Sequence, residues 1–289
     1  MLFKNIGTQL LKILKDNVDK ENRQWLFSKI EGIVESESTK DLYLTYSLVP
    51  AKIKSEKDLS LLLDDKELKD YLEVQHANLQ QIGRIYLLYK VLEAKEEFFK
   101  AKVANIIEVA DKGELETFLK FLVLLPHPEN YKVQAVEALR TNISTVFDAI
   151  ALNNPYPALY FNEQQWNQMY LKAAFMQQNL NEIVQVEKRG NKELARIISD
   201  YAHERWAASR EIDPCFWRPV GNFMNDKLLK DMKRLFASEN MAERKAAALC
   251  CYHSNSSEAK AMLDGYSELV KGIESGNITW GNIKNRTVF

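Results

Sequence analysis

The chain has 289 residues and a formal net charge of −1, with 46% hydrophobic and 27% charged residues. These proportions are typical of a water-soluble chain that buries a substantial core. The balanced charge excludes the basic surface that binds nucleic acid or an anionic membrane, so we predict no nucleic-acid partner.

Apolar residues recur with the period of an α-helix along most of the chain, and the alternation typical of strands is nearly absent. Only 10 Gly and 7 Pro interrupt this pattern, which therefore predicts an all-α protein. Asn162 and Asn191 are predicted N-caps, because each precedes a helical period. In chain order, the predicted helices cover 2–16, 20–36, 38–50, 56–64, 66–92, 94–111, 114–125, 129–152, 163–177, 191–209, 223–238, 240–253 and 256–275.

The first helix, over 2–16, has an apolar face and is expected to dock on the rest of the protein, although a membrane-surface helix is an alternative. Lys4, Lys12 and Lys15 interrupt any signal-peptide core. No run approaches the ~18–20 apolar residues of a membrane-spanning helix, so we predict no integral membrane segment.

The three cysteines, Cys215, Cys250 and Cys251, form no CxxC pair. They are expected to be buried, reduced thiols, which is typical of a cytoplasmic protein.

Residues 240–264 read as two Ala-rich helices joined by Ser-Asn-Ser-Ser, a pattern typical of a HEAT-type helical hairpin. Stacked helical hairpins in an irregular HEAT-like α-solenoid are therefore one predicted architecture. A compact helical array is the other. Residues 1–112 are predicted to form N-terminal helical layers, either as a separate subdomain or as the first layers of the same stack, and 113–289 a helical domain that ends in the HEAT-like hairpin.

Two motifs that carry chemistry are incomplete. His203-Glu204 begins a zinc-hydrolase motif, but position 207, where a second His is required, is Ala. The acidic run at 64–68 lacks the acid that a magnesium-diphosphate motif needs at Leu68. The remaining histidines are scattered, so we predict no metal site and no cofactor.

Polar residues on packed helix faces mark the segment 154–218 as the candidate site. Asn167 lies at the edge of the packed face of the helix over 163–177, and a buried amide must be hydrogen-bonded. Its partner is either a loop carbonyl, such as that of Asn154 or Pro155, or a ligand.

Arg205 falls in the middle of the apolar face of the helix over 191–209. A cation in that position must meet a carboxylate, an aromatic ring or a bound anion. If the helix over 129–152 is continuous, Glu137, Arg140 and Asp148 form a stripe that could pair with Arg205; Glu204 is a further candidate. A buried ion-pair network and a pocket for a small ligand are the two interpretations.

The candidate residues follow from these patterns. The structural ion-pair candidates are Glu137, Arg140, Asp148 and Arg205. The candidate ligand-binding residues are Asn154, Tyr156, Asn167, His203, Glu204, Arg205, Arg210, Trp217 and Arg218.

Five ordered motifs give the chain a family resemblance. They read EALRTN (137–142), NNPYPALYF (153–161), WNQMYLKAAF (166–175), LARIISDYAHERWAASR (194–210) and FWRPVG (216–221). With these motifs the chain resembles the EboA family, most clearly over 115–218 and little over the first hundred residues. The resemblance implies an all-helical protein from a bacterial gene cluster for metabolite production or traffic. It carries over no catalytic residue.

Three functions are compatible with the sequence. The first is a non-catalytic cytoplasmic adaptor or ligand-handling protein in a secondary-metabolite biosynthesis or traffic pathway. The second is a helical enzyme acting on a prenylated or phosphorylated metabolite, with Arg205, Arg210 and Arg218 on the anion and Glu204 or His203 as acid or base. The third is a generic protein-interaction module. The expected partner is a protein of the same pathway or a small anionic or prenylated metabolite.

Overall fold

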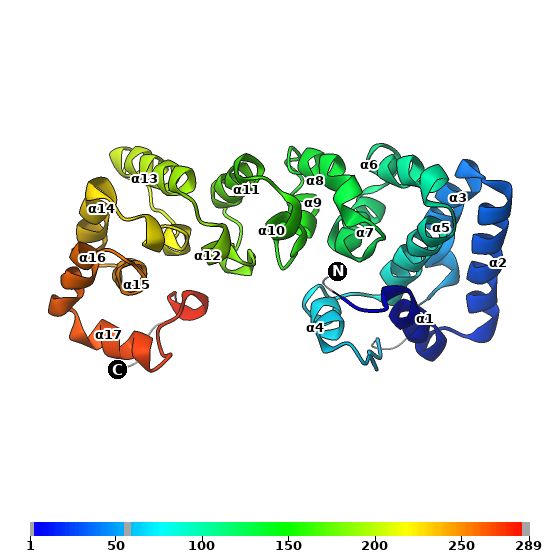
Figure 1. Ribbon diagram of the computed structural model, residues 1–289, viewed down its shortest axis with the longest axis horizontal. Helices are drawn as coiled ribbons and strands as arrows, with labels where there is room; N and C mark the ends of the chain where they lie inside the picture. The colour runs from blue at the N-terminus through cyan, green and yellow to red at the C-terminus, as the bar shows by residue number, and fades with distance from the viewer. Residues whose placement is uncertain (1–2, 55–58, 285–289) are drawn as a thin grey trace. The chain divides into compact units, whose positions relative to one another are not determined.

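The computed structural model describes residues 3–54 and 59–284 (Figure 1). Within these residues every regular element is an α-helix or a 3-10 helix, so the prediction of an all-α fold is confirmed. None of the described helices is long and apolar enough to cross a bilayer. By internal contacts the chain divides into two compact units, Met1–Tyr160 and Phe161–Phe289, and residue 112 falls inside the first.

The first unit is built around one long helix, α5, which packs against α1, α2, α3 and α7. Side chains on nearly all sides of its first half are buried, among them Ile85, Leu88 and Val91. Its helices are α1 (Ile6–Asn17), α2 (Lys20–Ser36), α3 (Thr39–Lys52), α4 (Lys66–Val74), α5 (Leu79–Ala104), α6 (Ile106–Val109), α7 (Lys112–Phe121), α8 (Lys132–Ala138), α9 (Ser144–Ala151) and α10 (Tyr156–Tyr160).

A buried polar contact ties three of these helices together. The Arg84 guanidinium on α5 lies 3.5 Å from the carboxylate of Glu114 on α7 and donates to the carbonyl of Tyr46 on α3 at 3.0 Å. The Tyr46 hydroxyl in turn donates to the Glu114 carbonyl at 2.9 Å. Both charged side chains are less than a tenth exposed. The ion pair is therefore shielded from solvent, where removal of one partner is costly.

The second unit is arranged around α15, which contacts α14, α16 and α17. Three successive alanines, Ala246 to Ala248, are fully buried on α15 and let neighbouring segments approach closely. A Cβ on Gly221 would lie 3.0 Å from the Cys250 carbonyl oxygen, so only glycine fits this approach without a shift. The helices are α11 (Glu163–Phe175), α12 (Val186–Arg189), α13 (Lys192–Ala207), α14 (Asp226–Phe236), α15 (Met241–Tyr252), α16 (Ser257–Ala261) and α17 (Ser267–Glu274).

Most helices begin at a residue whose own side chain accepts a hydrogen bond from the first turn. The predicted caps Asn162 and Asn191 are confirmed, and they accept from the backbone N–H of Gln165 and Leu194. The same role is filled by Asp19, Ser38, Asp65, Asn78, Asp111, Asn225, Asn240 and Ser256. These caps satisfy N–H groups that the helix itself leaves without partners.

Several predicted helices are shorter than expected or divided. In the helix predicted over 56–64, residues 59–64 are not helical and 56–58 lie outside the described residues. The helix predicted over 66–92 is interrupted between α4 and α5, where His76 adopts a left-handed backbone with φ of 49°. The helix predicted over 129–152 is wrong as a continuous element, because α8 and α9 are separated by residues 139–143. The second helix of the predicted C-terminal hairpin is limited to α16 and a following 3-10 turn, Met262–Gly265.

The three thiols are expected to be unreactive in the folded protein. Cys215, Cys250 and Cys251 are buried, and burial raises the pKa of the Cys215 and Cys251 thiols to about 12. Few thiolates then exist at mildly alkaline pH, and thiolate is the reactive form. Titration with Ellman's reagent should give no fast reaction in buffer and three equivalents after unfolding in urea. A fast native equivalent would show that one cysteine is accessible.

Candidate functional site

A cavity of about 360 Å³ lies in the second unit, between the end of α11, the end of α13 and the segment that follows α13. This volume is in the range of small-molecule pockets, about 300–1,000 Å³. The cavity is lined by Ala174, Gln177, Gln178, Tyr201, Arg205, Glu211, Ile212, Asp213, Pro214, Phe216, Asn240 and Lys284. No histidine or cysteine is among these lining residues, although the described chain has both.

Arg205 forms part of the cavity wall from the last turn of α13. Its Nε and Nη2 atoms donate to the backbone carbonyl of Glu211, at 3.1 and 2.7 Å, so the chain after α13 folds back onto the guanidinium. Among the residues that the structure describes, Arg205 makes no ion pair and is only half-buried. The helical period places Arg205 on the inner side of α13, but the group that it meets is a carbonyl.

The carboxylates that were expected to pair with Arg205 lie elsewhere in the structure. Glu137 and Asp148 belong to the first unit, and the break between α8 and α9 removes the continuous stripe on which they were to lie. Glu137 pairs with Arg140 at 2.8 Å on the surface, and Asp148 lies 3.5 Å from the hydroxyl of Ser144. Glu204 is exposed on α13.

The other charges of the cavity wall are largely paired. Lys284 Nζ lies 2.7 Å from Asp213 Oδ2, while Asp213 Oδ1 accepts a hydrogen bond from the Cys215 N–H at 2.9 Å. Both carboxylate oxygens of Asp213 are therefore engaged. The Glu211 side chain is exposed, where water solvates its charge.

The apolar side of the cavity rests on an aromatic cluster. The Tyr201 ring meets Phe216 edge-on, with 5.2 Å between ring centroids, and Phe216 stacks on Tyr170 at 5.6 Å and 8°. The Tyr170 hydroxyl donates to the Cys215 carbonyl at 3.1 Å, and burial raises its pKa well above the ordinary value. Packing from behind thus fixes the wall that Tyr201 presents to the cavity.

Two of the predicted ligand-binding residues, Asn154 and Tyr156, lie in the first unit and bond to its backbone. The Asn154 amide donates to the carbonyls of Leu119 and Ala149 at 3.1 and 2.9 Å, and its Oδ1 accepts from the Tyr156 N–H. The Tyr156 hydroxyl donates to the Pro128 carbonyl at 2.7 Å. Both side chains are almost completely buried, so they hold the α9–α10 connection in the first unit.

Asn167 bonds to another amide, not to the loop carbonyls considered from the sequence. Its Nδ2 donates to Asn191 Oδ1 at 3.2 Å, and Asn191 Nδ2 donates to Asn167 Oδ1 at 2.9 Å. This reciprocal pair joins α11 to Asn191, the N-cap residue of α13.

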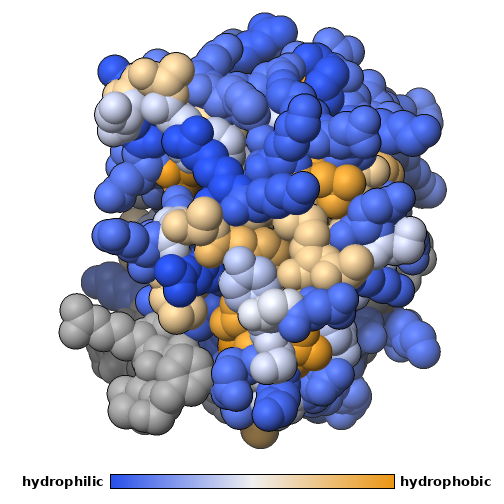
Figure 2. Space-filling model, turned by 90° about the vertical axis from the view of Figure 1, so that its left-hand side faces the viewer, coloured by the Kyte–Doolittle hydropathy of each residue, from blue (hydrophilic) through white to orange (hydrophobic). Residues whose placement is uncertain are grey.

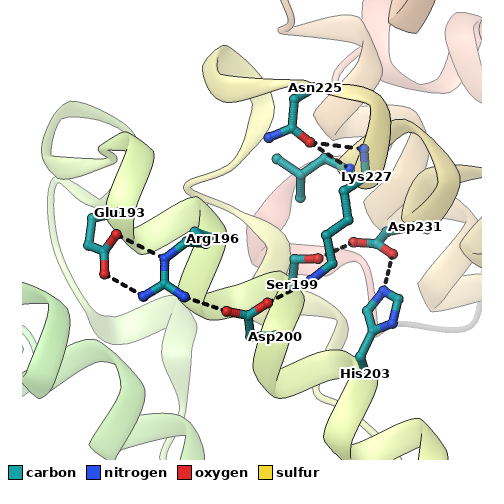
Figure 3. Close-up of polar contacts among 9 residues, drawn as sticks. Glu193, Arg196, Ser199, Asp200, His203, Asn225, Lys227 and Asp231 are labelled. Carbon is teal, nitrogen blue, oxygen red and sulfur yellow. Dashed lines mark hydrogen bonds and ion pairs between the residues drawn. The ribbon is translucent and has the colours of Figure 1, made fainter.

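A second polar cluster connects α13 to α14 (Figure 3). The buried Asp231 carboxylate accepts from the Ser199 hydroxyl at 2.6 Å and lies 2.7 Å from His203 Nε2. A Ser-His-Asp catalytic triad requires the serine to bond to the histidine, with the acid behind it. Here the acid lies between the two, so the three side chains do not form such a triad and the cluster joins the two helices.

Asp231 was missed by the sequence analysis, although a signal for it existed. It falls on the apolar face of α14 with Leu228 and Leu235, at the same three- and four-residue spacings that singled out Arg205 on α13. Next to it, an exposed chain of ion pairs runs from Glu193 through Arg196 and Asp200 to Lys227 (Figure 3).

The remaining candidates lie outside the cavity. Trp217 is fully buried and stacks on Trp206, with 5.8 Å between ring centroids. The Arg234 guanidinium lies over the Trp206 ring, 4.1 Å from its centroid. Arg218 is mostly buried and bonds through two nitrogens to the Glu187 carboxylate, at 2.7 and 3.0 Å. Arg210 is exposed and lines a separate, open depression beside Trp206 and Arg234.

The outer face of the second unit carries an apolar area. Figure 2 looks at the side on which α14, α16 and α17 lie in Figure 1, and it shows apolar side chains gathered in the middle and surrounded by hydrophilic ones. A shallow depression between α15 and α17 includes Tyr252, Leu263 and Val270.

Comparison with known proteins gives a single result. No curated protein and no solved structure shows significant similarity to the chain. The family described as metabolite traffic protein EboA matches residues 6–221, which is about three quarters of the 289 residues. The match begins in α1, so it includes the N-terminal helices in which the motifs gave little resemblance, and it stops before α14. Because more than half of the chain matches, this protein belongs to the EboA family of metabolite traffic proteins.

Proposed function

We propose that this chain is a non-catalytic, ligand-handling protein that holds a small metabolite during its traffic, in the cytoplasm. The observation that carries the proposal is the cavity of the second unit, which combines the guanidinium of Arg205 with an aromatic wall under Tyr201. The lining of the cavity combines polar and apolar side chains in similar measure, and small-molecule sites use such placed polar groups to orient a ligand beside an apolar wall. The family description, metabolite traffic, also supports the proposal that the protein holds a small metabolite.

Catalysis is the less favoured alternative, because the groups that it would need do not meet. Arg205, Arg210 and Arg218 were the expected anion-binding set, yet Arg218 is held by Glu187 and Arg210 lines a different depression. His203 bonds to Asp231 and is not among the cavity residues. The acid–base candidates named from the sequence, His203 and Glu204, are not among the residues that line the cavity with Arg205.

An adaptor role is the other alternative, and the apolar area on the outer face of the second unit favours it (Figure 2). Large exposed apolar areas commonly mark protein–protein contacts. The stacked helices, which we propose to be an irregular HEAT-like array, would present such a surface to a protein of the same pathway.

Native mass spectrometry of freshly purified protein tests the proposal. We expect a fraction of the protein to carry extra mass that corresponds to a small molecule, to lose it after denaturation, and to return it chemically unchanged. A stoichiometric protein partner without a small molecule would support the adaptor alternative. Conversion of the recovered molecule on incubation with fresh protein would contradict the proposal and support the enzyme.

A further inference from the structure

We infer that the cavity of the second unit binds a small molecule with a carboxylate or phosphate group at Arg205 and a flat, apolar ring against Tyr201. The inference rests on the proposed function and adds to it the class of ligand and its orientation. It follows from the hydrogen bonds that the protein already makes, since these determine which atoms of the wall remain for a ligand.

The guanidinium of Arg205 is held in place but not saturated. Arginine has five N–H donors in one plane, and the Glu211 carbonyl takes one from Nε and one from Nη2. Both N–H groups of Nη1 and one of Nη2 make no hydrogen bond to another described residue. Because the Glu211 carbonyl fixes the plane of the group, these donors are preorganised for the two oxygens of an oxyanion.

Within the described residues, neither acid of the cavity wall forms an ion pair with Arg205. Both oxygens of Asp213 are occupied, by Lys284 Nζ and by the Cys215 N–H. The Glu211 carboxylate is exposed to solvent and makes no ion pair to a described side chain. An oxyanion of a ligand can therefore approach Arg205 without displacing an internal partner.

Asn240, another residue of the cavity wall, also presents a donor. Asn240 caps α15, so its Oδ1 accepts from the Ala242 N–H at 2.9 Å. Its Nδ2 is the part that remains for a ligand. The donors that Arg205 and Asn240 leave unengaged favour a ligand with acceptor atoms, while the exposed Glu211 carboxylate is the acid of the wall that makes no ion pair to a described residue.

The other part of the wall selects an apolar, flat group. Tyr201 is half-buried and is supported from behind by Phe216, while Ile212 and Ala174 complete the apolar lining. An aromatic ring prefers offset stacking or edge contact with another ring. The ligand therefore places its oxyanion at Arg205 and its ring over Tyr201.

Calorimetric titration of the full chain with three probes tests this inference: benzoate, phenyl phosphate and the neutral benzamide. We expect benzoate or phenyl phosphate to bind saturably. Benzamide should bind at least about tenfold more weakly, because benzamide lacks the negative charge. The tighter of the two anions identifies a carboxylate or a phosphate as the natural group. Equal binding of benzamide, or no saturable binding of either anion at millimolar concentration, would overturn the inference.

Variants locate the binding. Arg205→Met should weaken binding of the anion about 10- to 100-fold, as expected for loss of a charge-assisted hydrogen bond. Arg205→Lys should cause an intermediate loss of affinity. Arg210→Met, which removes an exposed arginine five residues along the chain and outside the cavity, is the matched control and should bind as the parent does. Unchanged binding by Arg205→Met, or an equal loss in the control, would overturn the inference.

Two further measurements keep the tests separate. If Arg205→Met does not fold, as judged by circular dichroism, Arg205→Lys and Tyr201→Leu are tested in its place, and both should bind the anion more weakly than the parent does. In native mass spectrometry, Arg205→Met can be compared with the parent for the amount of metabolite that stays bound. Equal amounts would leave the proposed function intact but would refute this site. Turnover of a metabolite, by contrast, refutes the proposed function, while the titrations still decide on the site.

Discussion

Arg84→Met is expected to lower the free energy of unfolding by about 3–5 kcal/mol, the cost of breaking a buried ion pair by removal of one partner. The variant leaves the Glu114 carboxylate buried without its cation and removes the hydrogen bond from α5 to the Tyr46 carbonyl. Because this contact joins α3, α5 and α7, the loss should appear as a lower urea midpoint for the first unit. Urea titration followed by far-ultraviolet circular dichroism measures it.

The matched control is Arg140→Met, which breaks an exposed pair with Glu137. Exposed pairs contribute about 0–1 kcal/mol, so this variant should unfold almost as the parent does. The double variant Arg84→Met/Glu114→Leu should recover most of the loss, because no buried charge remains. Equal effects of Arg84→Met and Arg140→Met would show that the Arg84 pair is hydrated and not buried.

Trp217→Ala should destabilise the second unit by about 3–5 kcal/mol, the usual cost of truncating a large buried side chain. Trp217 is fully buried, stacks on Trp206, and accepts a hydrogen bond from Cys250 Sγ at its carbonyl. The cavity left by the indole would lie between η4 (Pro214–Trp217) and α15, where contacts are dense. Because the chain has two compact units, the transitions should be fitted separately rather than as one two-state step.

Trp280→Ala is the control for this variant, since Trp280 is only half-buried in a short 3-10 helix. We expect it to cost clearly less than Trp217→Ala. The sequence had placed Trp217 among the ligand-binding residues. Normal stability of Trp217→Ala combined with loss of a bound metabolite would restore that earlier interpretation.

The helices α11 and α13 could be predicted closely from the sequence, because their signals are local. Asn162 and Asn191 are each followed by a clear apolar period, and both caps are present in the structure. A cap and the first turn that it serves lie within four residues, so neither depends on distant parts of the chain.

The break between α8 and α9 could not be predicted, because residues 139–143 contain neither Gly nor Pro. The chain turns there with the Thr141 hydroxyl accepting from the Ile143 N–H at 3.0 Å. The break between α4 and α5, by contrast, is stabilised by a distant partner, since Gln75 Nε2 donates to the carbonyls of Leu152 and Asn153. Tertiary contacts of this kind override local helix propensity.

The helical period of α13 singled out Arg205, and the structure places Arg205 in the cavity wall. The contact that Arg205 makes is decided by how residues 208–211 fold back after α13. That path leaves no periodic signal. Asp231 shows the converse, because its position on the helix face was a usable signal that the sequence analysis missed, whereas its partners, Ser199 and His203, required the structure.

The capping residues have a consequence for how the chain acquires its structure. Each capped helix start is specified by a side chain and a backbone N–H two or three residues apart, so it can form as soon as that stretch leaves the ribosome. Structures dominated by such local contacts fold fast, because little loop entropy is lost before the first favourable contacts form. Within the first unit, α2 and α3 pack as sequence neighbours, and in the second α14 and α15 do the same. Synthesis from the N-terminus therefore lets the first unit complete its core while the second is still being made.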